Sequence, residues 1–123
     1  MTDDLSDSRE SLRTDEPLGP GELTMRSERD GDVHTIALFG ELDLATADAV
    51  EQELQRVERS DARTIVLDLS GLTFMDSTGV RLLVNANTRS RTDNCRLSLR
   101  RGPAAVQRVM ELSGVADLLP FAD

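Results

Sequence analysis

The sequence predicts a small α/β fold in which a mixed β-sheet carries helices. Strand-type and helix-type apolar spacings follow one another in the order strand, strand, helix, strand, helix, strand, helix. A tight-turn signal, Asp30-Gly31, separates the first two strands and predicts that they run antiparallel. The later strands alternate with helices, which predicts parallel pairing through right-handed crossovers.

The first two strands are expected over residues 22–29 and 33–39, where polar and apolar side chains alternate. His34 lies at an alternate position with Ile36 and Leu38, so its side chain is expected on the same face of the second strand as these apolar residues. Because the chain has no second histidine, we expect His34 to be a structural residue on an edge strand, and neither a ligand nor a catalytic base.

A helix is expected after the second strand, with Asp43 or Thr46 as its N-cap. Its apolar stripe repeats at spacings of three and four residues and consists of Ala47, Val50, Leu54 and Val57. The next strand contains a nearly continuous apolar run over residues 65–69, which is typical of a central strand covered on both faces.

Four residues, Asp76, Ser77, Thr78 and Gly79, lie where this strand meets a second helix that runs to about Arg89. A further strand is expected over residues 94–99. The last helix is expected over residues 102–115, with Pro103 at its first position and Gly114 just past its end. Residues 115–121 are short and apolar, and their pattern predicts no particular element.

At 123 residues the chain is expected to form one domain around one core. Residues 1–21 are acidic and poor in apolar side chains, which predicts a disordered extension, and residues 22–123 make up the folded domain. No apolar run approaches the roughly 20 residues that span a bilayer, and the acidic N-terminus lacks the apolar segment of a signal peptide. We therefore expect a cytoplasmic protein with no membrane partner.

The composition excludes several kinds of chemistry. All 14 basic residues are arginine, whereas a P-loop, a Schiff-base enzyme and a protein kinase each need a lysine. Asp68 likewise lacks the lysine and the acid cluster of a receiver-domain site. The chain also lacks the G-x-S-x-G motif of a serine hydrolase. Because Cys95 is the only cysteine, neither an intramolecular disulfide nor an all-cysteine metal site can form. We therefore expect no enzyme, no metal site and no cofactor.

The charge distribution bears on possible partners. A net charge of −9 argues against nonspecific nucleic-acid binding, because that affinity depends on basic contacts to phosphates. Residues 81–108 nevertheless hold seven arginines and one acid, without any aromatic residue on which bases could stack. This stretch indicates a solvated face or an acidic protein partner, and a small-ligand or nucleotide site stays open as an alternative.

Four blocks of residues occur together in this chain. They are Gly40-Glu41-Leu42-Asp43, Val66-Leu67-Asp68-Leu69, Phe74-Met75-Asp76-Ser77-Thr78-Gly79, and the pattern P-A-x-V-x-R-x-x-x-x-S-G from Pro103 to Gly114. Each block alone is a weak signal, but their order and spacing resemble the STAS domain of bacterial anti-sigma factor antagonists. The resemblance covers about residues 23–118.

The resemblance implies a small mixed sheet with helices, here residues 22–123, and a role in transcription regulation by partner switching. In that family the serine at the position of Ser77 is phosphorylated by the partner anti-sigma factor, which is a serine kinase. The unphosphorylated antagonist binds this kinase and frees the sigma factor, whereas the phosphorylated antagonist releases it until a serine phosphatase resets the cycle. Matching positions make Asp43, Asp76, Ser77, Thr78 and Gly79 the expected partner-binding residues, with Thr78 a second candidate phosphoacceptor.

Two other interpretations stay open. Ser77 could serve as an ordinary helix cap, since Ser, Thr and Asp side chains accept hydrogen bonds from free N–H groups. The domain could also be a scaffold or transport-associated STAS protein that self-associates without a phosphorylation cycle. Family members usually carry a further helix where this sequence stops soon after Phe121, so we expect apolar surface to be exposed there.

Overall fold

The computed structural model describes Gly19 and residues 21–122, so the acidic extension predicted over residues 1–21 lies almost entirely outside the described residues. The strands are β1 (Leu23–Asp30), β2 (Val33–Leu42), β3 (Thr64–Met75) and β4 (Arg96–Arg100). The helices are α1 (Ala47–Glu58), α2 (Ser77–Thr92), α3 (Ala104–Leu112) and the short 3-10 helix η2 (Ala116–Leu118). The predicted element order is confirmed, with η2 added near the C-terminal end.

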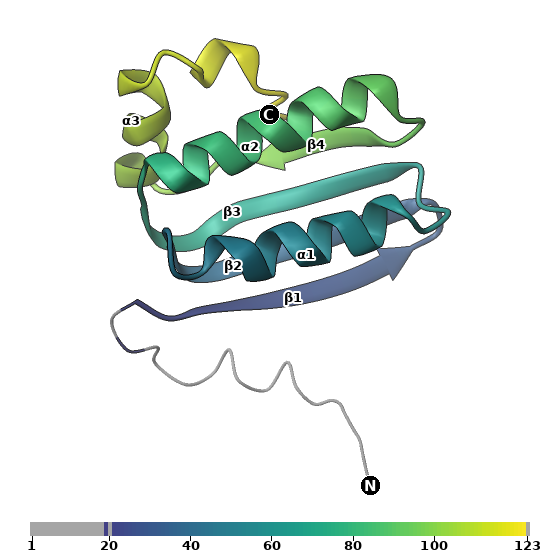
Figure 1. Cartoon of the computed structure of the whole chain (residues 1–123), viewed down its shortest axis with the longest axis horizontal. Coiled ribbons are helices and arrows are strands. Elements are labelled where there is room, and N and C mark those ends of the chain that lie inside the picture. Colours follow the sequence, from purple (N-terminus) through teal and green to yellow (C-terminus); the bar gives the residue numbers. More distant parts are fainter. Residues whose placement is uncertain (1–18, 20, 123) are drawn as a thin grey trace, which may run out of the picture.

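The strands form one mixed sheet in the order β1-β2-β3-β4. β1 pairs with β2 antiparallel, and β2–β3 and β3–β4 are parallel, which confirms the predicted fold class. The hairpin loop is Gly31-Asp32, and Gly31 has a φ of 61°, a left-handed conformation that glycine adopts without a steric penalty. Figure 1 shows α1 and α2 lying side by side across one face of the sheet, with α3 beyond the start of α2.

The position of β2 differs from the prediction. β2 lies between β1 and β3, so the expectation that His34 occupies an edge strand is wrong. His34 is buried with the apolar residues of the same parity, at 8% exposure. A hairpin signal identifies only one neighbour of a strand, and the second neighbour, β3, follows after the whole of α1.

β3 is longer than the apolar run that predicted it and is covered on one face only. Buried and half-buried residues alternate along its first half, so the predicted coverage on both faces is wrong. The β2–β3 register shifts twice, and Gly71 lies between the shifts, paired with Phe39. A Cβ at Gly71 would lie 2.5 Å from Phe39 Cδ1 and 2.6 Å from the Leu38 carbonyl oxygen. Glycine therefore allows this close approach, and the strand continues to Met75.

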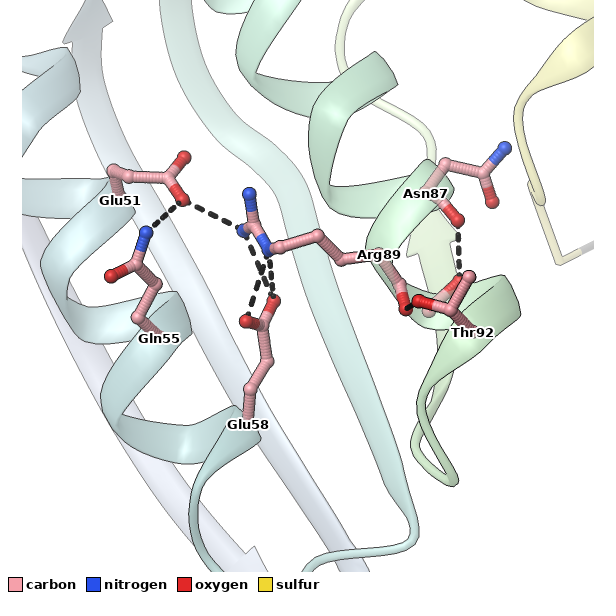
Figure 2. A network of polar contacts seen from close by, with 7 residues as sticks. Glu51, Gln55, Glu58, Asn87, Arg89 and Thr92 are labelled. Carbon is pink, nitrogen blue, oxygen red and sulfur yellow. Dashed lines mark hydrogen bonds and ion pairs between the residues drawn. The ribbon is translucent and has the colours of Figure 1, made fainter.

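A polar network ties α1 to α2 on the surface of the helical layer. The predicted α1 stripe is buried against the sheet, while on the outer side Arg89 of α2 reaches two carboxylates of α1 (Figure 2). Arg89 Nη2 lies 2.7 Å from Glu51 Oε2, and Arg89 Nε lies 3.1 Å from Glu58 Oε1. Gln55 Nε2 donates to Glu51 Oε2 at 2.9 Å, which holds that carboxylate in place.

The C-terminal segment, for which the sequence predicted no element, returns to the sheet. Phe121 forms a single parallel bridge with Leu99 of β4. The Leu99 N–H donates to the Pro120 carbonyl at 2.9 Å, and the Ala122 N–H donates to the Leu99 carbonyl at 2.9 Å. These bonds hold the end of the described chain beside β4.

Apolar side chains are exposed near this end of the chain, as expected. Leu112 at the end of α3 is 75% exposed, and Leu118 of η2 is 65% exposed. Asn87 Nδ2 of α2 donates to the Leu118 carbonyl at 3.2 Å, which places η2 over the middle of α2. Within the described part of the chain, no helix combines the length and the apolar character needed to cross a membrane.

Candidate functional site

The carboxyl ends of β2 and β3 bring two acidic loops together. Leu42 and Met75, the last residues of the two strands, are register partners. The Asp76 N–H donates to the Leu42 carbonyl at 3.3 Å. Because the strands are parallel, the residues that follow them, Asp43 and Asp76, lie at the same edge of the sheet.

Asp76 is the N-cap of α2. Its backbone is extended, with φ −111° and ψ −169°, and its side chain accepts hydrogen bonds from the first turn of the helix. Asp76 Oδ1 lies 2.9 Å from the Thr78 nitrogen and 3.4 Å from the Gly79 nitrogen. A capping carboxylate satisfies N–H groups that have no partner within the helix, and its charge is favourable at this end of the helix.

Ser77 is the first residue of α2, and its side chain is exposed. Its hydroxyl makes no hydrogen bond within the part of the chain that the structure describes. The interpretation of Ser77 as the helix cap is therefore wrong, because Asp76 performs that role. The Ser77 hydroxyl is left free and reachable from solvent.

Asp43 stabilises the turn that leads into α1. Asp43 Oδ1 accepts from the Ala45 nitrogen at 3.0 Å and from the Thr46 nitrogen at 3.2 Å. Thr46 is the N-cap of α1, as one of the two predicted alternatives had it, but its side chain makes no capping hydrogen bond. Its hydroxyl instead donates to the Glu41 carbonyl at 2.8 Å. Asp43 therefore fixes the shape of the loop beside the first turn of α2.

Thr78 and Gly79 complete the predicted set. Thr78 is half-buried, and Gly79 is buried against the ends of the two strands. A Cβ at Gly79 would lie 2.5 Å from Met75 Cγ and 3.1 Å from Leu42 Cδ2. Glycine thus lets the first turn of α2 sit directly on the sheet, and this contact sets the position of Ser77.

Three exposed residues at this edge were not singled out by the sequence analysis. Leu44, in the loop after Asp43, is 79% exposed, and Phe74, next to the end of β3, is 46% exposed. Arg81 is exposed on α2 and had entered only the count of arginines. Leu44 could have been noticed from the sequence, because it is an apolar residue in a predicted loop, where polar residues are usual. Exposed apolar side chains grouped around polar ones are typical of protein-binding surfaces.

The groups with perturbed acidity lie toward the other end of the sheet. Burial, with the nearby Arg56 cation, lowers the pKa of His34. Burial raises the pKa of the Cys95 thiol, which keeps it protonated and unreactive at neutral pH. A hollow of about 610 Å³ beside Cys95 is lined by both acids and arginines, including Asp32 and Arg63, and so favours no single class of ligand. Among the described residues, no three possible metal ligands are grouped together.

Comparison with known proteins identifies the fold family. The profile described as "Mlab, STAS domain" matches residues 25–120. The chain belongs to the STAS domain family. The match covers most of the chain and confirms the resemblance that the four sequence blocks predicted.

This STAS domain is similar to proteins named as anti-sigma factor antagonists. It is 30% identical over 92 residues to the anti-sigma-B factor antagonist of Listeria monocytogenes, a match that covers 75% of this chain and 81% of the relative. It is 28% identical over 102 residues to the anti-sigma F factor antagonist of Paenibacillus polymyxa, a match that covers 82% of this chain and 87% of the relative. A crystal structure of an anti-sigma factor antagonist from Mycobacterium paratuberculosis superposes with a TM-score of 0.76 at 25% identity, covering 84% of this chain and 87% of that one.

The edge of the STAS domain at the start of α2 offers three kinds of group. These are the free hydroxyl of Ser77, two carboxylates held by backbone N–H groups, and the exposed apolar side chain of Leu44 in the loop after Asp43. Such an arrangement can dock a protein partner, and its hydroxyl can accept a group that the partner transfers.

Proposed function

We propose that this STAS domain is an anti-sigma factor antagonist that binds an anti-sigma factor serine kinase while Ser77 is unmodified and releases it once Ser77 is phosphorylated. The observation that carries the proposal is the free, exposed hydroxyl of Ser77 directly after the cap residue Asp76. The names of the relatives support the class of partner. A serine phosphatase returns the chain to its binding form, so the cycle controls sigma-factor-dependent transcription in the cytoplasm.

The kinase step requires access to Ser77 and does not require the fold to open. The γ-phosphoryl group of ATP is transferred to Ser77 Oγ, which gives up its proton, and ADP leaves. The helix cap is made by Asp76, so modification of Ser77 leaves the capping hydrogen bonds in place. The phosphate adds a charge of about −1.5 to −2 at neutral pH.

Release of the partner follows from electrostatics at the same edge. The new charge lies beside Asp76 and at the edge that also carries Asp43, and neither carboxylate can offset it. The phosphate carries close to two charges, and the part of this charge that no cation offsets costs about 3 to 5 kcal/mol when it is buried in an interface. Since about 1.4 kcal/mol is one decade in affinity, binding weakens by roughly 100-fold or more. The switch therefore lies in the interface, and the domain keeps its structure.

Two measurements test the proposal. The protein is incubated with its cognate anti-sigma factor kinase and ATP, and the phosphate is located by mass spectrometry. We expect the label on Ser77 and no label on Ser77→Ala; a Thr78→Val variant shows whether the second hydroxyl also accepts phosphate. A protein that carries no phosphate on Ser77 would refute the proposal, and phosphate on Thr78 alone would assign the switch to the second hydroxyl.

Calorimetric titration of the kinase then separates a local effect from a general one. Ser77→Ala is expected to bind like the wild type, and Ser77→Asp at least about 10-fold more weakly, because one charge reproduces part of the phosphate's effect. Thr88→Asp is the matched control, since it adds the same charge at an exposed position on the same helix. Equal affinities for Ser77→Asp and Thr88→Asp would contradict the interface mechanism.

The exposed leucines favour a second candidate function. Leu112 and Leu118 are apolar and solvent-facing, which suits a STAS scaffold that associates with further copies of itself. Sedimentation over a wide range of concentrations tests this function. A protein that remains monomeric throughout would exclude self-assembly, whereas an oligomer that dissociates in a Leu112→Ser, Leu118→Ser variant would support it.

A further inference from the structure

Arg81 lies one helical turn after Ser77 on α2. Residues four apart on a helix have their Cβ atoms about 5 to 6 Å from each other, and an acidic group N-terminal to a basic one is the favourable order. Both side chains are exposed. Arg81 makes no ion pair or hydrogen bond within the described residues, so its guanidinium is available.

Two backbone N–H groups near Ser77 are already engaged. Asp76 Oδ1 accepts from the Thr78 and Gly79 nitrogens, so a phosphate on Ser77 could use these N–H groups only by displacing the cap. The helix N-terminus is therefore occupied by a carboxylate of this chain. A phosphate beside it needs a cation from elsewhere.

The other two arginines of α2, Arg89 and Arg91, cannot supply a cation to a phosphate on Ser77. Arg89 is held between the carboxylates of Glu51 and Glu58 on α1. Arg91 follows Ser77 by about 21 Å along the helix, at about 1.5 Å per residue, and so lies beyond the reach of a side chain. Within α2, Arg81 alone combines a free guanidinium with the right spacing.

We propose that Arg81 is the intramolecular partner of the phosphate on Ser77 and holds it against the first turns of α2. This inference rests on the proposed phosphorylation of Ser77. The planar guanidinium donates two parallel N–H groups to phosphate oxygens, a geometry that a lysine does not reproduce. Phosphorylation then changes two things at once: it adds negative charge beside Asp76, and it withdraws the cation of Arg81 from any partner.

The test uses protein in which phosphoserine is inserted at position 77 during translation, so no kinase is involved. Phosphorus NMR follows the second ionisation of the phosphate, whose pKa is about 6 when unperturbed. An opposite charge nearby favours the dianion, so Arg81→Gln is expected to raise this pKa by about 0.2 to 0.4. Arg81→Lys keeps the charge and is expected to retain most of the wild-type value, and about 1 M salt should shrink the difference.

Arg91→Gln is the matched control, because it removes the same charge from an exposed position on the same helix. It is expected to leave the phosphate pKa unchanged. Equal values for the wild type and Arg81→Gln would overturn the proposal, as would an equal rise in Arg91→Gln, which would indicate a diffuse field. The kinase labelling experiment decides separately whether Ser77 is the modified residue, so the two proposals can fail independently.

Discussion

Replacement of Asp76 by alanine tests whether this residue acts as the cap that keeps Ser77 free. The change removes the bond to the Thr78 nitrogen at 2.9 Å and the longer bond to the Gly79 nitrogen at 3.4 Å. Loss of an N-cap costs about 0.5 to 2 kcal/mol, typically about 1. For a domain of near 100 residues, 1 kcal/mol lowers the melting temperature by about 4 to 8 °C. Far-UV circular dichroism is the suitable probe, because the chain has no tryptophan or tyrosine.

Asp76→Asn is the matched control for this experiment. Asparagine caps helices about as well as aspartate, so the hydrogen bonds remain and only the favourable charge at the helix N-terminus is lost. We therefore expect the fall in melting temperature of the asparagine variant to be less than half of the fall in the alanine variant. Equal losses would show that charge, and not capping, is the role of Asp76. An unchanged melting temperature in Asp76→Ala would refute the capping argument altogether.

Three further changes probe other contacts. Gly79→Ala should destabilise the fold by about 1 to 3 kcal/mol in urea unfolding, because the new methyl would lie 2.5 Å from Met75 Cγ; a wild-type midpoint would contradict this packing. Arg89→Gln should cost about 1 to 2 kcal/mol and less at high salt, since its two carboxylate partners on α1 are only partly exposed; salt-independent melting would argue against the ion pairs. Burial lowers the pKa of His34, so its contribution to stability is complete above about pH 6.5 and is lost as the pH falls. His34→Leu should flatten the pH dependence between about pH 7.5 and 5.5, and identical slopes in both proteins would exclude His34 as its source.

Local signals account for the parts of the fold that the sequence predicted. Asp30-Gly31 specifies a two-residue hairpin because its glycine takes the left-handed conformation that the turn needs. The apolar stripe of α1 and the proline and glycine around α3 likewise act within a few residues of each other. The four blocks that indicated the family are also short local segments, and two of them, residues 40–43 and 74–79, lie at the ends of β2 and β3, which is why the region of the site could be located from the sequence.

Contacts between distant segments account for what the sequence did not predict. The choice between Asp76 and Ser77 as cap depends on where β3 ends, and that end is set by pairing with Leu42 of β2. The pairing of β2 with β3 on its second side also depends on a segment distant in the sequence. This explains why His34 was wrongly expected on an edge strand. The bridge of Phe121 to β4 joins segments that only the finished sheet brings together, so no pattern near Phe121 could reveal it.

The C-terminal bridge also protects an open edge of the sheet. An edge strand with unpaired backbone groups can recruit a strand from another molecule, which leads to strand exchange or aggregation. At β4 the amide and carbonyl of Leu99 are already taken by the chain's own residues Pro120 and Ala122. The opposite edge, β1, ends in Arg26-Ser27-Glu28-Arg29-Asp30, where alternating charges discourage intermolecular pairing. Both edges thus carry features that oppose strand addition, which favours side-chain surfaces such as the one around Ser77 for contact with a second protein.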